Sequence, residues 1–406
     1  MDKTPLHRWI ASKISGDPLR EDFSQIDLRR YQLERLKQTI EHAISCSSFY
    51  KRRLAGLSAD PLKHLEDLRQ FPFTTSEDLQ ERGSEFLCVS QSLIKEVLTR
   101  RIRGASDSSR LYFTSEDLDQ ILDYYHQAIS TFVKPGNKVL VLVAGDGREG
   151  GAELFAQDLC SMTCEAMDRD RKCRQGELLA KALRGINVDG IVRTAEEAVS
   201  SILRHDIDTV AGVPVQVQSL VGHDDVASIP YGRIRSVVIT SDRVHPVLAG
   251  QLKRMWGCRV FYHYGTAETG LAGGVECQAR QGYHLRETDL YFEVVDPSSG
   301  EPLPPGETGE IVFTTLTRQG MPLIRYRTGD RSRFLMAPCP CGSHLRRLER
   351  VEGRLEENRK GSGLLLAHVV RPHEPRADLT PYADTGAQES SYDKTNDYYM
   401  RFAGKG

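Results

Sequence analysis

Five short apolar segments alternate with helix-like segments between residues 138 and 263, and this alternation constrains the fold more than any other feature. Continuous apolar strands joined by helices are typical of a mostly parallel sheet covered on both faces. The sequence therefore predicts an α/β protein. The expected strands are 138–144, 188–193, 208–213, 235–240 and 259–263, and the expected helices are 151–161, 175–184, 194–204, 215–221 and 245–256.

The regions on either side of this central part show different patterns of apolar and turn-forming residues. Residues 26–44 carry apolar side chains at helical spacing and predict an amphipathic helix. Thr75 or Ser76 would cap a second helix, and a similar Thr-Ser-Glu-Asp stretch at 114–117 opens a third that runs to about Phe132. From about residue 288, short strands separated by turns predict a small β-rich subdomain. Beyond Lys360 the chain is polar and turn-rich, and we expect it to be poorly ordered.

Composition excludes several classes of protein. The 406 residues are 39% hydrophobic and 27% charged, with a formal net charge of −2. This balance describes a soluble globular protein and argues against a general nucleic-acid or membrane-surface binder. No apolar run approaches the roughly 20 residues that span a bilayer, and the N-terminal segment lacks the apolar core of a secretory signal. We therefore expect a cytoplasmic protein with two or three subdomains.

Cysteine spacing predicts a metal site. Most of the nine cysteines are scattered singly, which is not the pattern of a disulfide framework. Cys277 and His284 are separated by six residues, and Cys339 and Cys341 form a C-x-C turn next to prolines. Three thiolates and one imidazole suit a closed tetrahedral Zn²⁺ site, whose role would be structural. The alternative is a few reduced surface cysteines near a histidine.

A glycine-rich loop offers a competing interpretation. Gly145-x-Gly147-x-x-Gly150 follows an expected strand and precedes an expected helix, which is the context of a dinucleotide-binding turn. Asp168 and Asp170 lie about twenty residues further on, where a ribose-binding acid would stand. The strand expected after this unit is weak, however, and the unit does not open a domain. A nicotinamide-dinucleotide site is therefore the less favoured reading.

Two short motifs point to nucleotide chemistry. Tyr-Gly-Thr-Ala-Glu-Thr-Gly occupies 264–270, and Tyr-Arg-Thr-Gly-Asp occupies 326–330. Each is expected to place one carboxylate, Glu268 or Asp330, in a Gly/Thr-rich turn beside an aromatic ring. Either motif alone is also compatible with an ordinary turn. Two further segments follow the same order, Gly-Glu-Thr-Gly-Glu-Ile-Val-Phe-Thr-Thr-Leu at 306–316 and Arg-Val-Glu-Gly-Arg at 350–354.

Taken together, these segments resemble the adenylate-forming superfamily, and the nearest branch is that of the phenylacetate–CoA ligase-like enzymes. The resemblance covers about residues 65–356. It implies the large N-terminal domain of that family, with layered, mostly parallel sheets flanked by helices plus a small β-rich subdomain. The implied organisation is an N-terminal helical segment (1–65), an α/β nucleotide- and acyl-binding core (66–287), a β-rich subdomain with the zinc loop (288–356) and a short polar tail (357–406).

The resemblance also implies roles for individual residues. Glu268 would hold Mg²⁺, and Asp330 would accept hydrogen bonds from both ribose hydroxyls. Arg354 matches an arginine near the ribose and phosphate, and Glu356 stands at the family's hinge position. Some members of the branch have zinc ligands at positions matching Cys277, His284, Cys339 and Cys341. Tyr264, Gly265 and Thr266 would flank the adenine and α-phosphate.

The acyl substrate would lie in the same cleft. Its pocket would draw on residues 213–215, 240–242 and 262–264. Ser241 and Asp242 are accordingly expected to bind ligand. Asp242 has a plainer alternative as the cap of the helix that follows it.

Two departures from the family pattern bear on activity. The stretch Gly-Ala-Ser-Asp-Ser-Ser-Arg at 104–110 replaces a phosphate loop that normally has paired glycines and a lysine. Asp107 would repel a triphosphate, although Arg110 could replace the lysine. The chain also stops about where the family's C-terminal domain, with its catalytic lysine, would begin. Lys405 echoes that lysine only superficially.

Two functions follow from this sequence. The first is an ATP-dependent, acyl-adenylate-forming ligase, similar to an acyl-CoA synthetase, with ATP, AMP, Mg²⁺ and coenzyme A as ligands. Its substrate would be a small carboxylic acid, with an aromatic acid as one option. The second is a non-catalytic or partner-dependent nucleotide- and zinc-binding scaffold of the same fold. A homodimer, or a separate chain that supplies the lysine domain, would then be the partner.

Overall fold

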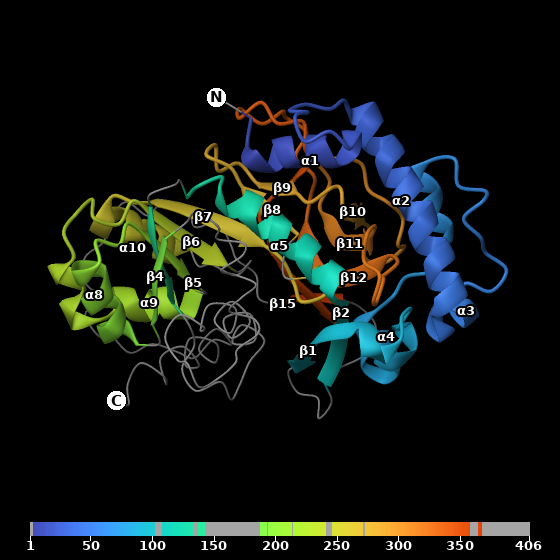
Figure 1. Cartoon of the computed structure of the whole chain (residues 1–406), viewed down its shortest axis with the longest axis horizontal. Coiled ribbons are helices and arrows are strands. Elements are labelled where there is room, and N and C mark those ends of the chain that lie inside the picture. The colour runs from blue at the N-terminus through green and yellow to red at the C-terminus, as the bar shows by residue number, and fades with distance from the viewer. Residues whose placement is uncertain are drawn as a thin grey trace.

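The computed structural model describes residues 3–101, 108–133, 137–142, 187–192, 194–212, 214–240, 246–270, 273–357 and 364–367. Two large sheets, a small two-stranded sheet and the helices packed on them make up this part of the chain (Figure 1). None of its helices is long and apolar enough to cross a membrane. Several predictions fall outside the described residues: the helices at 151–161 and 175–184, the glycine loop at 145–150 with Asp168 and Asp170, residues 104–107, Val213, Ser241, Asp242, and the tail from 368 to 406, including Lys405.

The larger sheet confirms the expected strand–helix alternation. It has eight strands in the order β13-β9-β8-β7-β6-β5-β3-β4, and the five from β7 to β4 run parallel. Helices α8 (Ala195–Arg204), α9 (Pro214–Val221) and α10 (Pro246–Trp256) match three of the expected helices. The strands are β3 (Lys138–Leu142), β4 (Asn187–Val192), β5 (Thr209–Gly212), β6 (Ser236–Thr240), β7 (Arg259–Tyr264), β8 (Gly274–Glu276), β9 (Tyr283–Leu285) and β13 (Arg347–Leu348).

The second sheet is antiparallel and has five strands in the order β10-β11-β12-β14-β15. Its presence agrees with the short strands expected after residue 288. The expectation of a turn at 326–330 is wrong, because these residues form strand β12, in which burial alternates residue by residue. The strands are β10 (Leu290–Val295), β11 (Gly309–Thr315), β12 (Tyr326–Ser332), β14 (Gly353–Glu357) and β15 (Leu364–Ala367).

Capping residues fix where the helices begin. Thr75 caps α4 (Ser76–Arg82) and Thr114 caps α5 (Ser115–Ile129), each through a capping box with the aspartate three residues on. Both starts were predicted, the first with Thr75 or Ser76 as its cap and the second from the stretch at 114–117. The remaining elements before residue 230 are α1 (Pro5–Ser15), α2 (Gln25–Cys46), α3 (Ser48–Arg53), the hairpin β1 (Ile94–Arg101) and β2 (Ser108–Thr114), and the 3₁₀ turns η1 (Leu65–Gln70), η2 (Gly83–Phe86), η3 (Gln91–Leu93) and η5 (Asp224–Ser228).

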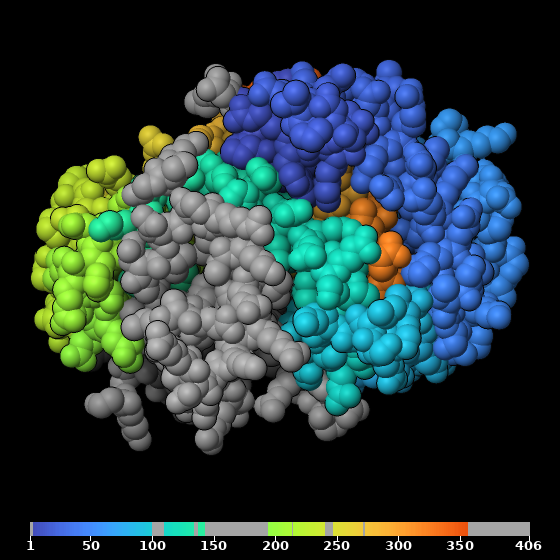
Figure 2. Space-filling model, viewed as in Figure 1, coloured from blue at the N-terminus to red at the C-terminus, as the bar shows by residue number. Residues whose placement is uncertain are grey.

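The N-terminal helices pack on the rest of the chain. Gln32 of α2 donates to the Glu287 carbonyl at 2.8 Å, and Thr39 donates to the Leu316 carbonyl at 3.1 Å. In Figure 2 these helices (blue) lie beside α5 (teal) and the C-terminal residues (orange), and α1 contacts α5 while α2 contacts β11. The division into domains at residues 65, 287 and 356 stays a prediction. Strand β13, which lies inside the predicted β-rich subdomain, pairs with β9 of the larger sheet.

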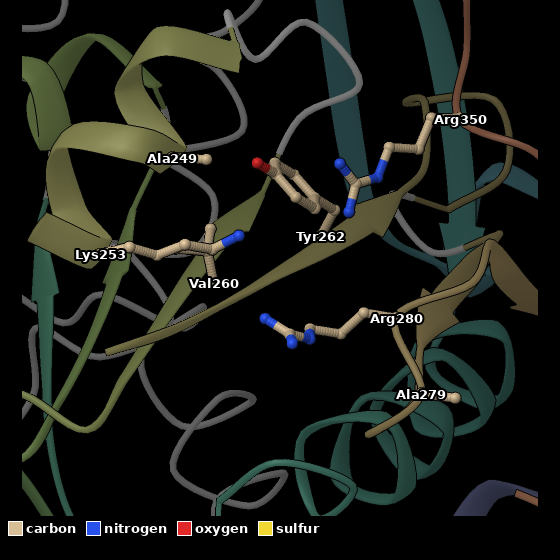
Figure 3. A pocket seen from close by; sticks show the side chains of 7 residues that line it. All are labelled: Ala249, Lys253, Val260, Tyr262, Ala279, Arg280 and Arg350. Carbon is tan, nitrogen blue, oxygen red and sulfur yellow. The ribbon is translucent and has the colours of Figure 1, made fainter. Parts of the chain in front are cut away.

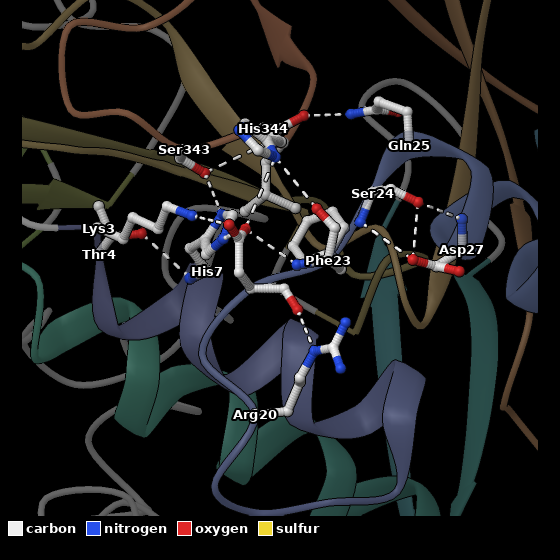
Figure 4. Close-up of polar contacts among 12 residues, drawn as sticks. Lys3, Thr4, His7, Arg20, Phe23, Ser24, Gln25, Asp27, Ser343 and His344 are labelled. Atoms are coloured by element: carbon white, nitrogen blue, oxygen red, sulfur yellow. Dashed lines mark hydrogen bonds and ion pairs between the residues drawn. The ribbon is translucent and has the colours of Figure 1, made fainter.

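A buried histidine anchors α1 to the segment that carries Cys339 and Cys341 (Figure 4). The Nδ1 atom of His7 lies 3.0 Å from the hydroxyl of Ser343, and its Nε2 atom lies 3.0 Å from Asp22. The His7 ring stacks on Phe23 with centroids 4.7 Å apart. Burial lowers the pKa of His7 to about 4, so the ring is neutral at pH 7.

Candidate functional site

Two tyrosine–carboxylate hydrogen bonds join the 264–270 motif to the 326–330 motif. The Tyr264 hydroxyl donates to Asp330 Oδ2 at 3.1 Å, and the Tyr326 hydroxyl donates to Glu268 Oε1 at 3.1 Å. The tyrosine of each motif therefore binds the carboxylate of the other. All four side chains are buried. The bonds fix the end of β7 against β12 and hold both carboxylates at the junction of the two sheets.

The turn that carries Glu268 is closed by its own threonines. Thr269 Oγ1 accepts from the Thr266 amide at 2.9 Å and donates to the Thr266 carbonyl at 2.8 Å. Gly270 ends the turn with a φ of 71°, a left-handed conformation that favours glycine. Thr266 Oγ1 is buried and has no hydrogen-bond partner among the described residues. Its free hydroxyl is consistent with a ligand oxygen beside the turn.

Asp330 and Arg354 face each other across neighbouring strands. They are direct partners in the β12–β14 register. Gly329 has a φ of 75°, and a Cβ added there would lie 3.3 Å from Arg354 Nε. The arginine stem therefore lies over a position that only glycine leaves open. This places two of the predicted nucleotide-binding residues side by side, as the sequence motifs required.

Three groups at this site were missed by the sequence analysis. Tyr326 is part of the quoted motif, but no role was assigned to it. Asp117 accepts from the amides of Gln319 at 2.7 Å and Gly320 at 3.0 Å, and so clamps the β11–β12 loop to the start of α5. Arg318 lies in that loop and is 8% exposed. Burial lowers the pKa of Arg318 to about 10, although Asp117 and Glu268 both act to raise it.

The predicted zinc ligands converge into one cluster. One ligand atom from each of Cys277, His284, Cys339 and Cys341 lies within 4.8 Å of the others, and all four residues are buried. Cys277 Sγ is 3.5 Å from Cys339 Sγ, and Cys341 Sγ is 3.4 Å from His284 Nε2. Three sulfurs and one imidazole nitrogen at these separations fit a tetrahedral Zn²⁺ ion.

Strand pairing explains how the cluster forms. Cys277 follows β8, His284 lies in β9, and Cys339 and Cys341 precede β13, and these three strands are neighbours in the larger sheet.

Contacts within the cluster shift the pKa values of its members. Contact with Cys341 and burial raise the pKa of Cys277 to about 11. Burial opposes charge on His284, but contacts with Cys277 and Cys339 raise its pKa above the usual value.

A small cavity of about 200 Å³ lies next to this cluster, between α10, β7 and the loop after Cys277. The Arg350 guanidinium lies beside the ring of Tyr262, and Lys253 and Arg280 extend into the same cavity from other elements (Figure 3). Arg350 binds the buried Glu276 at 2.7 Å and stacks 3.9 Å from the Tyr262 ring centroid. Its charge is therefore already balanced by a carboxylate.

The remaining predicted site residues are only partly placed. Tyr262 and Tyr264 lie on β7 with His263 between them. His263 is buried near the rings of Tyr124 and Tyr125, and burial lowers its pKa to about 4. Arg110 is exposed on β2, and the backbone of Glu356 lies in β14. Gly265 directly follows β7 and leads into the Glu268 turn. Ser241 and Asp242 lie outside the described residues.

Comparison with known proteins agrees with this geometry. The model of the AMP-binding enzyme family matches residues 179–317. The phenylacetate–coenzyme A ligase of Escherichia coli is 27% identical over 84% of this chain and 74% of the relative. The corresponding ligase of Pseudomonas putida is 27% identical over 86% and 75%.

A solved structure extends the agreement to the fold. The open conformation of 2-hydroxyisobutyryl-CoA ligase, in complex with 2-HIB-AMP and CoA, has a TM-score of 0.69 at 19% identity. The match covers 85% of this chain and 79% of that one. These similarities support placing the chain in the adenylate-forming superfamily, in its phenylacetate–CoA ligase-like branch.

Proposed function

We propose that this protein is an ATP-dependent ligase that activates a small carboxylic acid as its acyl-adenylate and transfers the acyl group to coenzyme A. The observation that carries the proposal is the crossed pairing of Tyr264 with Asp330 and of Tyr326 with Glu268. The similarity to phenylacetate–coenzyme A ligases over most of both chains supports the same activity.

The carboxylates are suited to different parts of a nucleotide. Asp330, opposite Arg354, would accept hydrogen bonds from the ribose hydroxyls, a role that suits an acceptor with two oxygens. Glu268 would hold Mg²⁺, which neutralises charge on phosphate oxygens when it is bound. Each carboxylate is held by a neutral phenol donor, which orients the group without cancelling its charge.

The turn before Glu268 would position the phosphates. Tyr264 and Gly265 would flank the adenine, and the Thr266 hydroxyl would donate to an oxygen of the α-phosphate. In this arrangement the residues of the chain orient the α-phosphate for attack by the substrate carboxylate, and pyrophosphate leaves. Orientation and charge stabilisation are the main contributions that a protein makes to such a step.

The cysteine–histidine cluster would hold a structural Zn²⁺ ion. All four protein ligands come from the chain, which leaves no open position for a substrate and is typical of structural rather than catalytic zinc. The ion would tie the β8–β9 turn to the segment before β13. This part of the proposal is independent of catalysis.

The proposal is tested by titrating the metal-replete protein with ATP·Mg²⁺ and with AMP, while pyrophosphate release is measured over a panel of aryl and short-chain acids. Acid-dependent release together with nucleotide binding is the expected result. A protein that binds neither nucleotide would contradict the assignment of Asp330 and Glu268.

A scaffold that binds nucleotide without turnover is the second candidate. The sequence at 104–110 favours it, because the stretch has no paired glycines and includes Asp107 next to the expected phosphate position. The same experiment separates the two functions. Nucleotide binding without pyrophosphate release, for any acid in the panel, would support the scaffold.

A further inference from the structure

Arg318 differs from the other buried arginines of the described residues, which are Arg286, Arg325 and Arg347. Arg286 binds Asp289 at 2.6 Å, and Arg325 binds both oxygens of Glu293. Arg347 donates to the carbonyls of Gln281 and Ala337. Among the same residues, Arg318 Nη1 is buried and has no hydrogen-bond partner. The guanidinium carbon of Arg318 lies 4.9 Å from the centroid of the Phe113 ring.

The backbone around Arg318 is fixed. Gln319 and Gly320 donate their amides to Asp117, as described above, and Cys88 donates its amide to the Gly320 carbonyl at 3.0 Å. On the other side, the Leu316 amide donates to the Asp289 carbonyl at 2.8 Å. Because the loop is held at both ends, the guanidinium is positioned before any ligand arrives.

This guanidinium lies against the turn that carries Glu268. A Cβ added at Gly270 would be 3.4 Å from Arg318 Nη2, so the arginine reaches the last residue of the 264–270 motif. The carboxylates of Glu268 and Asp117 both favour its charge. Asp117, however, already accepts three backbone amides, from Thr114, Gln319 and Gly320. Arg318 lies beside Glu268, the proposed Mg²⁺ ligand, and is therefore placed to bind the phosphate anion that Mg²⁺ would accompany.

A buried guanidinium nitrogen without a hydrogen-bond acceptor, such as Arg318 Nη1, is costly for the ligand-free protein. The lowered pKa of Arg318 agrees with this, because burial outweighs the two nearby carboxylates. An arrangement of this kind is retained where a ligand supplies the missing acceptor. Phosphate oxygens are the acceptors that an arginine fork matches best.

We infer that Arg318 is an internal phosphate-binding cation, which donates to oxygens of the polyphosphate of ATP or of the leaving pyrophosphate beside the 264–270 turn. The inference rests on the proposed function for the identity of the nucleotide. Arg318 would supply, from the β11–β12 loop, a positive charge for the polyphosphate. The 104–110 segment of this chain contains no lysine for that role.

The test compares Arg318→Met and Arg318→Lys with the parent, and uses Arg333→Met as a matched control on an exposed arginine that pairs with Glu349. Binding of ATP·Mg²⁺, inorganic pyrophosphate and adenosine is measured, together with the melting temperature without ligand. We expect Arg318→Met to weaken ATP and pyrophosphate binding by about 10- to 100-fold, the range for one or two hydrogen bonds to a charged group. Adenosine binding should not change, and Arg318→Lys should restore part of the loss.

The ligand-free melting temperature provides a second readout, one that a purely structural arginine would move in the opposite direction. Arg318→Met should melt at or above the parent temperature, because it removes a buried cation whose desolvation outweighs the nearby carboxylates and whose Nη1 atom has no acceptor. A lower melting temperature with unchanged pyrophosphate affinity would overturn the inference. Parent protein that binds pyrophosphate but not adenosine would support the Arg318 site and contradict the nucleotide function. If Arg318→Met leaves ATP and pyrophosphate binding unchanged, while parent and variant both bind adenosine, the result would support the nucleotide function and contradict the Arg318 site.

Discussion

The cysteine–histidine cluster and the tyrosine–carboxylate site are assembled in different ways. The cluster takes His284 from β9 and its three cysteines from the segments that follow β8 and precede β13, and these three strands are neighbours in one sheet. The carboxylate site takes Tyr264 and Glu268 from the end of β7 in the larger sheet, and Asp330, Tyr326 and Arg354 from the antiparallel sheet. The first can therefore form with one sheet alone, whereas the second depends on how the two sheets pack.

This difference suggests different duties. A closed set of four protein ligands stabilises local structure and leaves no place for a substrate. A site shared between two sheets can change its geometry when their packing changes, which is common at ligand-binding clefts. The two sites should therefore respond differently to substitution: the cluster mainly in stability, and the carboxylate site mainly in binding.

The largest effect is expected at the cluster. Cys339→Ser removes one of four ligands, and we expect loss of bound zinc and a fall in unfolding free energy of about 3–5 kcal/mol, because metal affinity contributes directly to folding. Metal analysis and urea denaturation measure both quantities. Cys46→Ser, at an exposed free cysteine, is the control. Equal metal content in the two variants would rule out the zinc site.

At the carboxylate site the effect should appear in binding. Asp330→Ala removes the acceptor that faces Arg354, and AMP affinity should fall by about 1.5–3 kcal/mol, the range for hydrogen bonds to a charged group. Isothermal titration measures the change, with Asp60→Ala on the exposed surface as the control. Unchanged AMP affinity would remove Asp330 from the nucleotide site.

The His7 anchor connects α1 to the cluster segment and makes their contact sensitive to acid. The folded pKa of about 4 lies below the ordinary 6.5, so the unfolded chain binds this proton more tightly. Stability is therefore lost as pH falls from about 6.5 toward 4. Between pH 7.5 and 5 we expect the parent to lose about 2 kcal/mol more than His7→Gln, as urea denaturation at the two pH values would show.

Lys3, Asp22 and His344 also face the His7 ring, and Asp22 partly offsets the effect of burial. Their titration is common to the parent and to His7→Gln, so the difference between the two proteins isolates His7. Equal acid sensitivity in both would contradict the prediction.

The smallest effect is expected at Gly329, where a substitution tests the role of Arg354 in nucleotide binding. Gly329→Ala introduces strain at a φ of 75° and a contact 3.3 Å from Arg354 Nε. Gly16→Ala has a similar φ of 71° with nothing within 4 Å, so it shares the strain without the contact. We expect each to cost about 1 kcal/mol of stability, and only Gly329→Ala to weaken AMP binding. Equal AMP affinity in both variants would show that Arg354 does not depend on Gly329.

Much of the fold could be predicted because its signals are local. The apolar strands from β3 to β7 are continuous runs, and Thr75 and Thr114 carry capping boxes within four residues. The turn predicted at 326–330 was wrong because Gly329 and Asp330 are common turn residues. The inward alternation of Tyr326, Thr328 and Asp330 shows only in the structure, because two of these three residues are polar and give no apolar period-2 signal.

The carboxylate site could be predicted only in part. The motifs identified Glu268 and Asp330, but not that each is bound by the tyrosine of the other motif, because those contacts join different sheets. Arg318 had no signal at all. A lone arginine in a polar loop is normally exposed, and only the packing of Asp117, Phe113 and Gly270 around the loop shows that it is buried.

The contact between His7 and Ser343 has a consequence for biosynthesis. The two residues are 336 positions apart, and Lys13 of the same helix binds Asp289, 276 positions away. During translation, α1 leaves the ribosome well before these partners and cannot dock until the segments carrying Asp289 and Ser343 have followed. Its apolar residues Leu6, Ile10 and Ala11, buried in the finished protein, wait exposed for that time. The nascent chain therefore exposes the apolar face of α1, which suits chaperones that bind short apolar segments.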